Sequence, residues 1–118
     1  MSPQHTDEFL RAAAEARSRI SEVEPAEVTR LVADGAVLID VRERDEYETG
    51  HIDGALLCSR DQLEDAISTL VPDKHTPIIC YCGGGNRGAL AADTLQQLGY
   101  DQVHSVAGGL RQYRKANP

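Results

Sequence analysis

The sequence predicts an α/β protein with a mostly parallel central sheet, helices on both faces and an N-terminal helical extension. Short apolar runs rich in β-branched residues alternate with stretches of helical periodicity. Glycine or proline separates most of these segments, and such alternation is typical of parallel sheets. With 118 residues, 41% of them hydrophobic and 26% charged, the chain suits one domain with one core.

The first predicted element is a helix over residues 7–18, with Thr6 as its N-cap. Its apolar positions share one face: Phe9, Ala13, Ala16 and Ile20. We therefore expect residues 1–19 to form a helical extension that packs on a domain made by residues 20–118. The alternative is a helix that binds a partner.

Two strands and a helix are predicted next. Residues 20–23 indicate a short edge strand. A helix then starts at Pro25 and ends before Gly35, because proline suits the first helical turn and glycine the position after the last. Residues 36–41 form a continuous apolar run, typical of a buried parallel strand.

The middle of the chain predicts a short helical turn over residues 45–49 and a short strand over residues 55–57. Ser59-Arg60-Asp61-Gln62 has the pattern of a capping box, in which two side chains satisfy backbone N–H groups at a helix start. Apolar residues follow at helical spacing: Leu63, Ala66, Ile67 and Leu70. We expect a helix that begins at this capping box.

The last third predicts a strand over residues 78–81, a long helix ending at Gly99, a strand over residues 102–106 and a helix over residues 110–116. Functional sites in parallel sheets lie beyond the carboxyl ends of the strands. Asp40 lies at the end of the run of residues 36–41, and Cys82 directly follows the strand of residues 78–81, so both are at such ends.

Cys82 stands between a strand and a helix start, in a glycine-rich turn. Backbone N–H groups and the positive end of a helix dipole converge there, which favours the thiolate over the thiol. Gly83, Gly84 and Gly85 can adopt positive φ angles and let their N–H groups approach an anion. We expect Cys82 to be a nucleophile in an anion-binding cradle; the alternative is a tight turn that ends in a buried cysteine.

The three cysteines suggest neither a disulfide framework nor a metal site. They are an odd number, form no C-x-x-C pair and lack zinc-like spacing with histidine. We expect reduced thiols, with Cys80 in the core because it lies two residues before Cys82 on the strand, and Cys58 packed as a small hydrophobe. No metal and no cofactor are predicted.

The formal net charge of −7 argues against a nucleic-acid partner, since such binding draws on lysine and arginine. An anionic substrate would need a local positive field, from the loop amides and Arg87. No apolar run approaches the ~20 residues that span a membrane, and the N-terminus lacks a signal-peptide pattern. We expect a cytoplasmic protein with no membrane partner.

The stretch from Val37 to Gly54 reads VLIDVRERDEYETGHIDG, and a cysteine-glycine loop and Gly108-Gly109 follow it. Over residues 20–116, these blocks resemble the rhodanese family of sulfurtransferases in order and spacing. The resemblance implies the rhodanese fold, with Cys82 carrying sulfane sulfur as a persulfide. It also implies thiosulfate or a related donor, and an acceptor such as cyanide, a small thiol or a thiol protein.

We expect the loop after Cys82 to hold the anionic donor and the negative charge of the persulfide: Gly83, Gly84, Gly85, Asn86, Arg87 and Gly88. Arg87 could instead face solvent or pair with an acid. Three charged residues are expected around the site: Asp40, Arg42 and Glu46. They could lock the loop or form a structural salt-bridge network, and we favour the network. Gly88 stands where many relatives have serine or threonine, and Tyr113 where tryptophan is frequent.

Two other functions compete with sulfur transfer. Tyrosine phosphatases and arsenate reductases also use a cysteine and an arginine around an anion loop, but the tyrosine-phosphatase signature has five intervening residues. Here four residues, Gly83 to Asn86, separate Cys82 from Arg87, leaving less room for a tetrahedral oxyanion. The second alternative is a non-catalytic rhodanese-like module that binds or senses a partner; such a module has no physical need for Cys82 or the glycine-rich loop.

Overall fold

The computed structural model describes residues 6–118, so the first five residues of the predicted extension lie outside it. Within the described residues, five strands form one sheet in the order β1-β5-β4-β2-β3, and every pair is parallel. The strands are β1 (Ser21–Val23), β2 (Val37–Asp40), β3 (Leu56–Leu57), β4 (Ile78–Tyr81) and β5 (Val103–Val106). The predicted α/β fold is confirmed.

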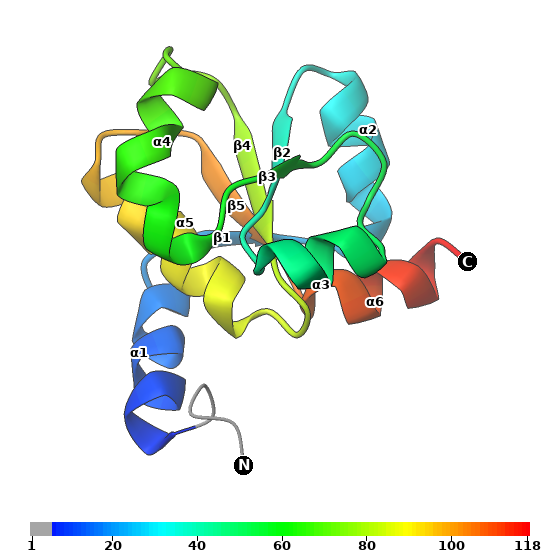
Figure 1. The fold of residues 1–118 in the computed structure, drawn as a ribbon, viewed down its shortest axis with the longest axis horizontal. Coiled ribbons are helices and arrows are strands. Elements are labelled where there is room, and N and C mark those ends of the chain that lie inside the picture. The colour runs from blue at the N-terminus through cyan, green and yellow to red at the C-terminus, as the bar shows by residue number, and fades with distance from the viewer. Residues whose placement is uncertain (1–5) are drawn as a thin grey trace.

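The helices cover both faces of this sheet (Figure 1). They are α1 (Asp7–Arg17), α2 (Val28–Ala33), α3 (Arg44–Thr49), α4 (Leu63–Leu70), α5 (Asn86–Gln97) and α6 (Gly109–Ala116). Helices α4 and α5 lie on one face and α2 and α6 on the other, while α1 packs beside α5. Short 3₁₀ turns, η2 (Pro25–Glu27) and η3 (Arg60–Gln62), lead into α2 and α4.

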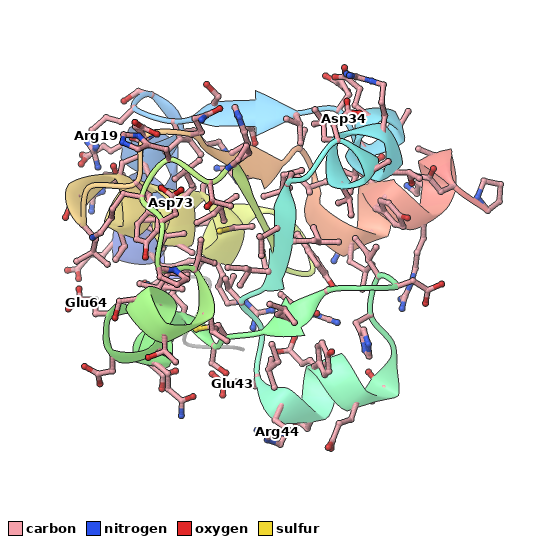
Figure 2. The ribbon with its side chains drawn as sticks, turned by 90° about the horizontal axis from the view of Figure 1, so that it is seen from above. Arg19, Asp34, Glu43, Arg44, Glu64 and Asp73 are labelled. Carbon is pink, nitrogen blue, oxygen red and sulfur yellow. The ribbon has the colours of Figure 1, made fainter. Side chains whose placement is uncertain are left out.

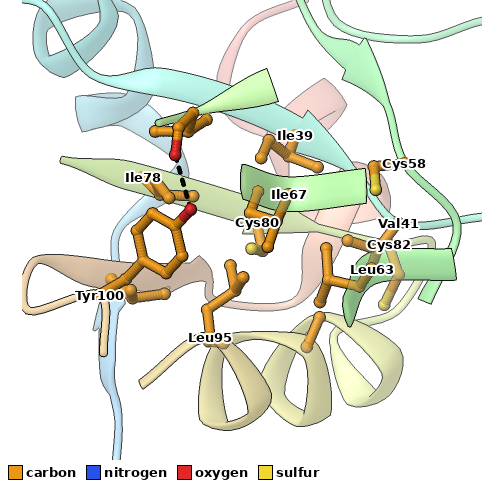
Figure 3. Packing of buried hydrophobic residues seen from close by; sticks show 14 residues of the cluster. Ile39, Val41, Cys58, Leu63, Ile67, Ile78, Cys80, Cys82, Leu95 and Tyr100 are labelled. Atoms are coloured by element: carbon orange, nitrogen blue, oxygen red, sulfur yellow. Dashed lines mark hydrogen bonds between the residues drawn. The ribbon is translucent and has the colours of Figure 1, made fainter. Parts of the chain in front are cut away.

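The core has two sides because successive residues of a strand point to opposite faces. Ile78 and Cys80 of β4 pack with residues of α4 and α5, whereas Ile79 and Tyr81 pack with residues of α2 and α6. Figure 3 shows the α4/α5 side, where the Tyr100 hydroxyl donates to the Val71 carbonyl at 2.6 Å. The alternation places Cys82 on this same side, with Cys80.

Figure 2 labels six charged residues that are exposed: Arg19, Asp34, Glu43, Arg44, Glu64 and Asp73. No helix within residues 6–118 has the length and apolar character needed to cross a membrane.

Most predicted elements are confirmed with boundaries that shift by a few residues. The Thr6 side chain accepts a hydrogen bond from the Phe9 N–H at 3.1 Å, so the predicted N-cap of α1 is confirmed. The predicted capping box at Ser59 is wrong, because the Ser59 side chain makes no capping hydrogen bond. The Ser59 hydroxyl donates instead to the Arg42 carbonyl at 3.0 Å, and the chain passes through η3 before α4 begins.

Candidate active site

Cys82 follows the last residue of β4 and is 1% exposed. Its sulfur accepts hydrogen bonds from the N–H of Gly85 at 3.1 Å and from the N–H of Gly88 at 3.2 Å. Both donors belong to the turn that opens α5, where the helix dipole is positive. This arrangement stabilises negative charge on the sulfur. We call residues 82–88 the nucleophile loop.

The three glycines after Cys82 do not share one conformation. Of Gly83, Gly84 and Gly85, only Gly85 has a positive φ, at +108°. A side chain there would be strained, and its Cβ would lie 3.4 Å from the Arg17 guanidinium. Gly85 is therefore the residue that turns the chain into α5.

The start of α6 is hydrogen-bonded to the nucleophile loop through backbone groups. The N–H of Leu110 donates to the Cys82 carbonyl at 2.7 Å, and the N–H of Arg111 donates to the Gly83 carbonyl at 3.1 Å. Gly109 has φ +66°, and a Cβ on it would lie 2.6 Å from the Cys82 carbonyl oxygen. This close approach accounts for glycine at position 109.

Arg87 pairs with an acid, which was one of the three placements considered for it, along with the anion loop and solvent. Its guanidinium donates to both carboxylate oxygens of Glu46 in α3, at 2.7 and 2.9 Å. The hydrogen bonds from Arg87 lower the pKa of Glu46 to about 2, and the same contact raises the pKa of Arg87. Glu46 also accepts from the N–H of Glu43, so α3 carries a capping box of its own.

Asp40 and Arg42 form a buried ion pair beside the loop, with exposures of 0% and 6%. The Arg42 guanidinium reaches the two Asp40 oxygens at 3.0 and 2.8 Å and the Gly50 carbonyl at 2.7 Å. Each buried charge therefore has a partner, which such burial requires. The geometry agrees with the structural salt-bridge network that we favoured for this pair.

A hollow of about 280 Å³ opens at the nucleophile loop. It is lined by Phe9, Glu46, Cys82, Gly83, Gly84, Asn86, Arg87 and Arg111. The structure thus brings together Cys82, most of the predicted loop and Glu46, whereas Asp40 does not line this hollow. Phe9 and Arg111 were not predicted as site residues. Phe9 gave no signal beyond its place on an apolar stripe, and Arg111 only its position after Gly108-Gly109.

The other cysteines have no comparable surroundings. Cys80 is 0% exposed and Cys58 3% exposed, and burial raises the pKa of both thiols. All three cysteines are free thiols, as expected. Among residues 6–118, no group of three or more histidine, cysteine or acidic side chains is placed to hold a metal ion.

Known proteins of similar sequence include two functional types. A thiosulfate sulfurtransferase GlpE of Pseudomonas entomophila is 32% identical over 101 residues, covering 86% of this chain and 91% of that protein. A tRNA uridine(34) hydroxylase of Erwinia tasmaniensis is 39% identical over 95 residues, covering 76% of this chain but only 27% of that protein. The chain therefore spans about a quarter of the hydroxylase.

A solved structure of a protein from Rhodopseudomonas palustris is similar, with a TM-score of 0.84 and 29% sequence identity. The match covers 98% of this chain and 96% of that protein's chain. That protein is described as having unknown function and as a possible tyrosine phosphatase. The sequence also matches the Rhodanese-like domain over residues 24–116. The chain belongs to the rhodanese-like domain family.

Proposed function

We propose that this protein is a sulfurtransferase that moves sulfane sulfur from thiosulfate or a related donor to a thiophilic acceptor through a persulfide on Cys82. One observation carries the proposal. The Cys82 sulfur accepts hydrogen bonds from two backbone N–H groups at the start of a helix, and Cys82 lines a pocket. Sulfurtransferase relatives that this chain covers almost completely support it.

The reaction divides into two displacements at sulfur. The Cys82 thiolate attacks the outer sulfur of thiosulfate; a sulfur–sulfur bond forms to Cys82, and the bond to the sulfonate sulfur breaks, releasing sulfite. The acceptor, a thiolate or cyanide, then attacks the terminal sulfur of the persulfide and restores the Cys82 thiolate. Charge balances in both steps, and neither needs a proton transfer once Cys82 is ionised.

Backbone groups supply the electrostatic part of this mechanism. The N–H groups of Gly85 and Gly88 point at the sulfur before any substrate arrives, so no reorganisation is required when charge is held there. Gly83, Gly84 and Asn86 line the pocket where the terminal sulfur and the anionic donor would lie. Arg87 positions the loop, since Glu46 occupies its guanidinium.

Phosphatase chemistry is the second candidate, because the R. palustris structure is described as a possible tyrosine phosphatase. Such enzymes need the arginine to bind the transferring phosphoryl group through both of its N–H arms. Here Glu46 holds both arms, and four residues separate Cys82 from Arg87. We do not propose tRNA hydroxylation, since the match spans only 27% of the hydroxylase.

Intact-mass spectrometry after incubation with thiosulfate tests the proposal. We expect the wild-type protein to gain one sulfur atom, to lose it on addition of cyanide, and to release sulfite and thiocyanate. Cys82→Ser is the matched control and should gain nothing. No added sulfur on the wild type, together with hydrolysis of an aryl phosphate, would replace this proposal with the phosphatase.

A further inference from the structure

Helix α1 lies outside the family match, which begins at residue 24, and yet it reaches the candidate active site. Phe9, in the first turn of α1, lines the same pocket as Cys82. Leu10, its neighbour, is 42% exposed and lies at a separate hollow on the outer side of α1 with Asp7, Arg11 and Ala14. The helix thus presents one aromatic side chain to the nucleophile.

Several contacts fix α1 in this place. Ala13 and Ala16 are 0% exposed, on the face of α1 that packs against α5. The Arg17 guanidinium donates to the Asn86 side chain at 2.6 Å, at the end of the nucleophile loop. Arg19, just beyond the helix, donates twice to Asp93 of α5, at 3.0 and 2.7 Å. The position of Phe9 is therefore tied to the helix whose first turn holds the Cys82 sulfur.

Phe9 differs in chemistry from the other residues around the pocket. Among the described lining residues, it carries the only large apolar side chain, and the rest are glycines, Cys82 and polar or charged groups. The Arg60 guanidinium, in the segment before α4, lies 6.0 Å from the Phe9 ring centroid and makes a cation–π contact with the ring. Arg111 supplies a positive charge at the same pocket.

We propose that Phe9 is a specificity-determining residue that binds an apolar group on the sulfur donor, while the anionic head of the donor faces Arg111. The inference rests on the proposed sulfur transfer and narrows its substrate class to organic donors, of which an aryl thiosulfonate is the simplest. Its reaction balances like that of thiosulfate. The Cys82 thiolate takes the outer sulfur, and an aryl sulfinate leaves with the bonding electrons.

Steady-state kinetics with two donors test this role. In Phe9→Ala we expect kcat/KM for benzenethiosulfonate to fall about threefold to tenfold, as for the loss of one aromatic contact. The value for thiosulfate, which has no apolar group, should change less than twofold. Leu10→Ala is the matched control, a truncation in the same helix outside the pocket, and should leave both values unchanged. Equal losses for both donors, or no loss for either, would overturn the proposal.

Alkylation of Cys82 provides a readout that needs no sulfur transfer. The rate of modification by N-benzyliodoacetamide, divided by the rate with iodoacetamide, is measured by intact mass in the wild type, Phe9→Ala and Leu10→Ala. We expect this ratio to fall threefold or more in Phe9→Ala only. If the wild type accepts sulfur from neither donor, the proposed sulfurtransferase function is wrong. The alkylation ratio still tests whether Phe9 binds an apolar group. An unchanged ratio in Phe9→Ala would show that Phe9 does not bind an apolar group, whether or not the protein transfers sulfur.

Discussion

The guanidinium of Arg87 and the carboxylate of Glu46 are joined by two hydrogen bonds, of 2.7 and 2.9 Å, between residues 41 positions apart in the sequence. The contact links α3, which follows β2, to the nucleophile loop, which follows β4. An arginine in this state holds protein structure together before any anion arrives. The positive field that meets a substrate must then come from backbone N–H groups and from Arg111.

Replacing Arg87 should expose the acid that it neutralises. In Arg87→Ala we expect the KM for thiosulfate to rise by the equivalent of about 1 to 2 kcal/mol, because the unpaired Glu46 carboxylate repels an anionic donor. Persulfide formation should survive. The double variant Glu46→Gln/Arg87→Ala should recover part of the loss, as kinetics of the two single variants and the double variant would reveal.

A double variant no better than Arg87→Ala would mean that Arg87 contacts the donor directly. Aryl phosphate serves as the second substrate in the same measurements. Turnover of aryl phosphate that exceeds that of thiosulfate, and that collapses in Arg87→Ala, would contradict the sulfurtransferase assignment.

Cys82→Ser should abolish sulfur transfer and leave the fold intact, because serine preserves the size of the side chain and removes the nucleophilic sulfur. Cys58→Ala and Cys80→Ala are the controls. Both thiols are buried, and burial keeps them protonated by raising the pKa, so most of the activity should remain. Thiocyanate production and circular dichroism measure the two properties. Loss of turnover in a folded Cys80→Ala variant would contradict the assignment of the reaction to Cys82.

The ion pair between Glu46 and Arg87 should make the folded state less stable as the solution becomes acidic. Hydrogen bonds from Arg87 lower the pKa of Glu46 from 4.5 to about 2, so the ionised form stabilises the folded state above about pH 4.5. That contribution is lost as the pH falls from about 4.5 towards 2. Urea unfolding of wild type and Glu46→Gln at about pH 6 and pH 3 measures it.

Between these two pH values the wild type should lose more stability than Glu46→Gln. The Glu46 side chain is 36% exposed, so solvent screening limits the difference to about 1 kcal/mol or less. Parallel losses in both proteins would show that the pair contributes nothing to folding.

Gly109→Ala should displace the nucleophile loop. Its Cβ would lie 2.6 Å from the Cys82 carbonyl oxygen and 2.7 Å from that of Gly83, at a φ of +66°. We expect a loss of about 2 kcal/mol in unfolding free energy together with reduced sulfur transfer. Gly83→Ala is the control for stability, because its nearest new contact is Arg87 at 3.8 Å and its φ is not positive. Equal stability of the two variants, measured by thermal unfolding, would contradict this account.

Local patterns predicted the scaffold of the site well. The strand at residues 78–81, the glycine turn and the following helix are set by neighbouring residues, so Cys82 could be placed at a helix start from sequence alone. The Ser59 capping box failed because Arg42, 17 positions earlier, offers a carbonyl that takes the serine hydroxyl. Local pattern cannot reveal that competing acceptor.

Contacts between distant segments were the part that could not be predicted. The Arg87 partner was left open between an acid, solvent and the loop, and its choice of Glu46 depends on how α3 packs beside the loop. Phe9 reaches the pocket only because α1 docks on α5 through small residues and arginine side chains. The contacts of the Leu110 and Arg111 N–H groups with the Cys82 and Gly83 carbonyls likewise require the start of α6 to lie beside the end of β4.

Cys82 is attached directly to the central strand of the sheet, β4. Every residue of β4 is at most 1% exposed, and the strand pairs with β2 on one side and β5 on the other. Backbone amides in such a strand exchange with solvent hydrogen only when the whole domain opens. Cys80 and Cys82 should therefore react with a thiol reagent by different routes. Cys82 reacts at the rate set by its pocket, whereas Cys80 reacts only while the domain is open.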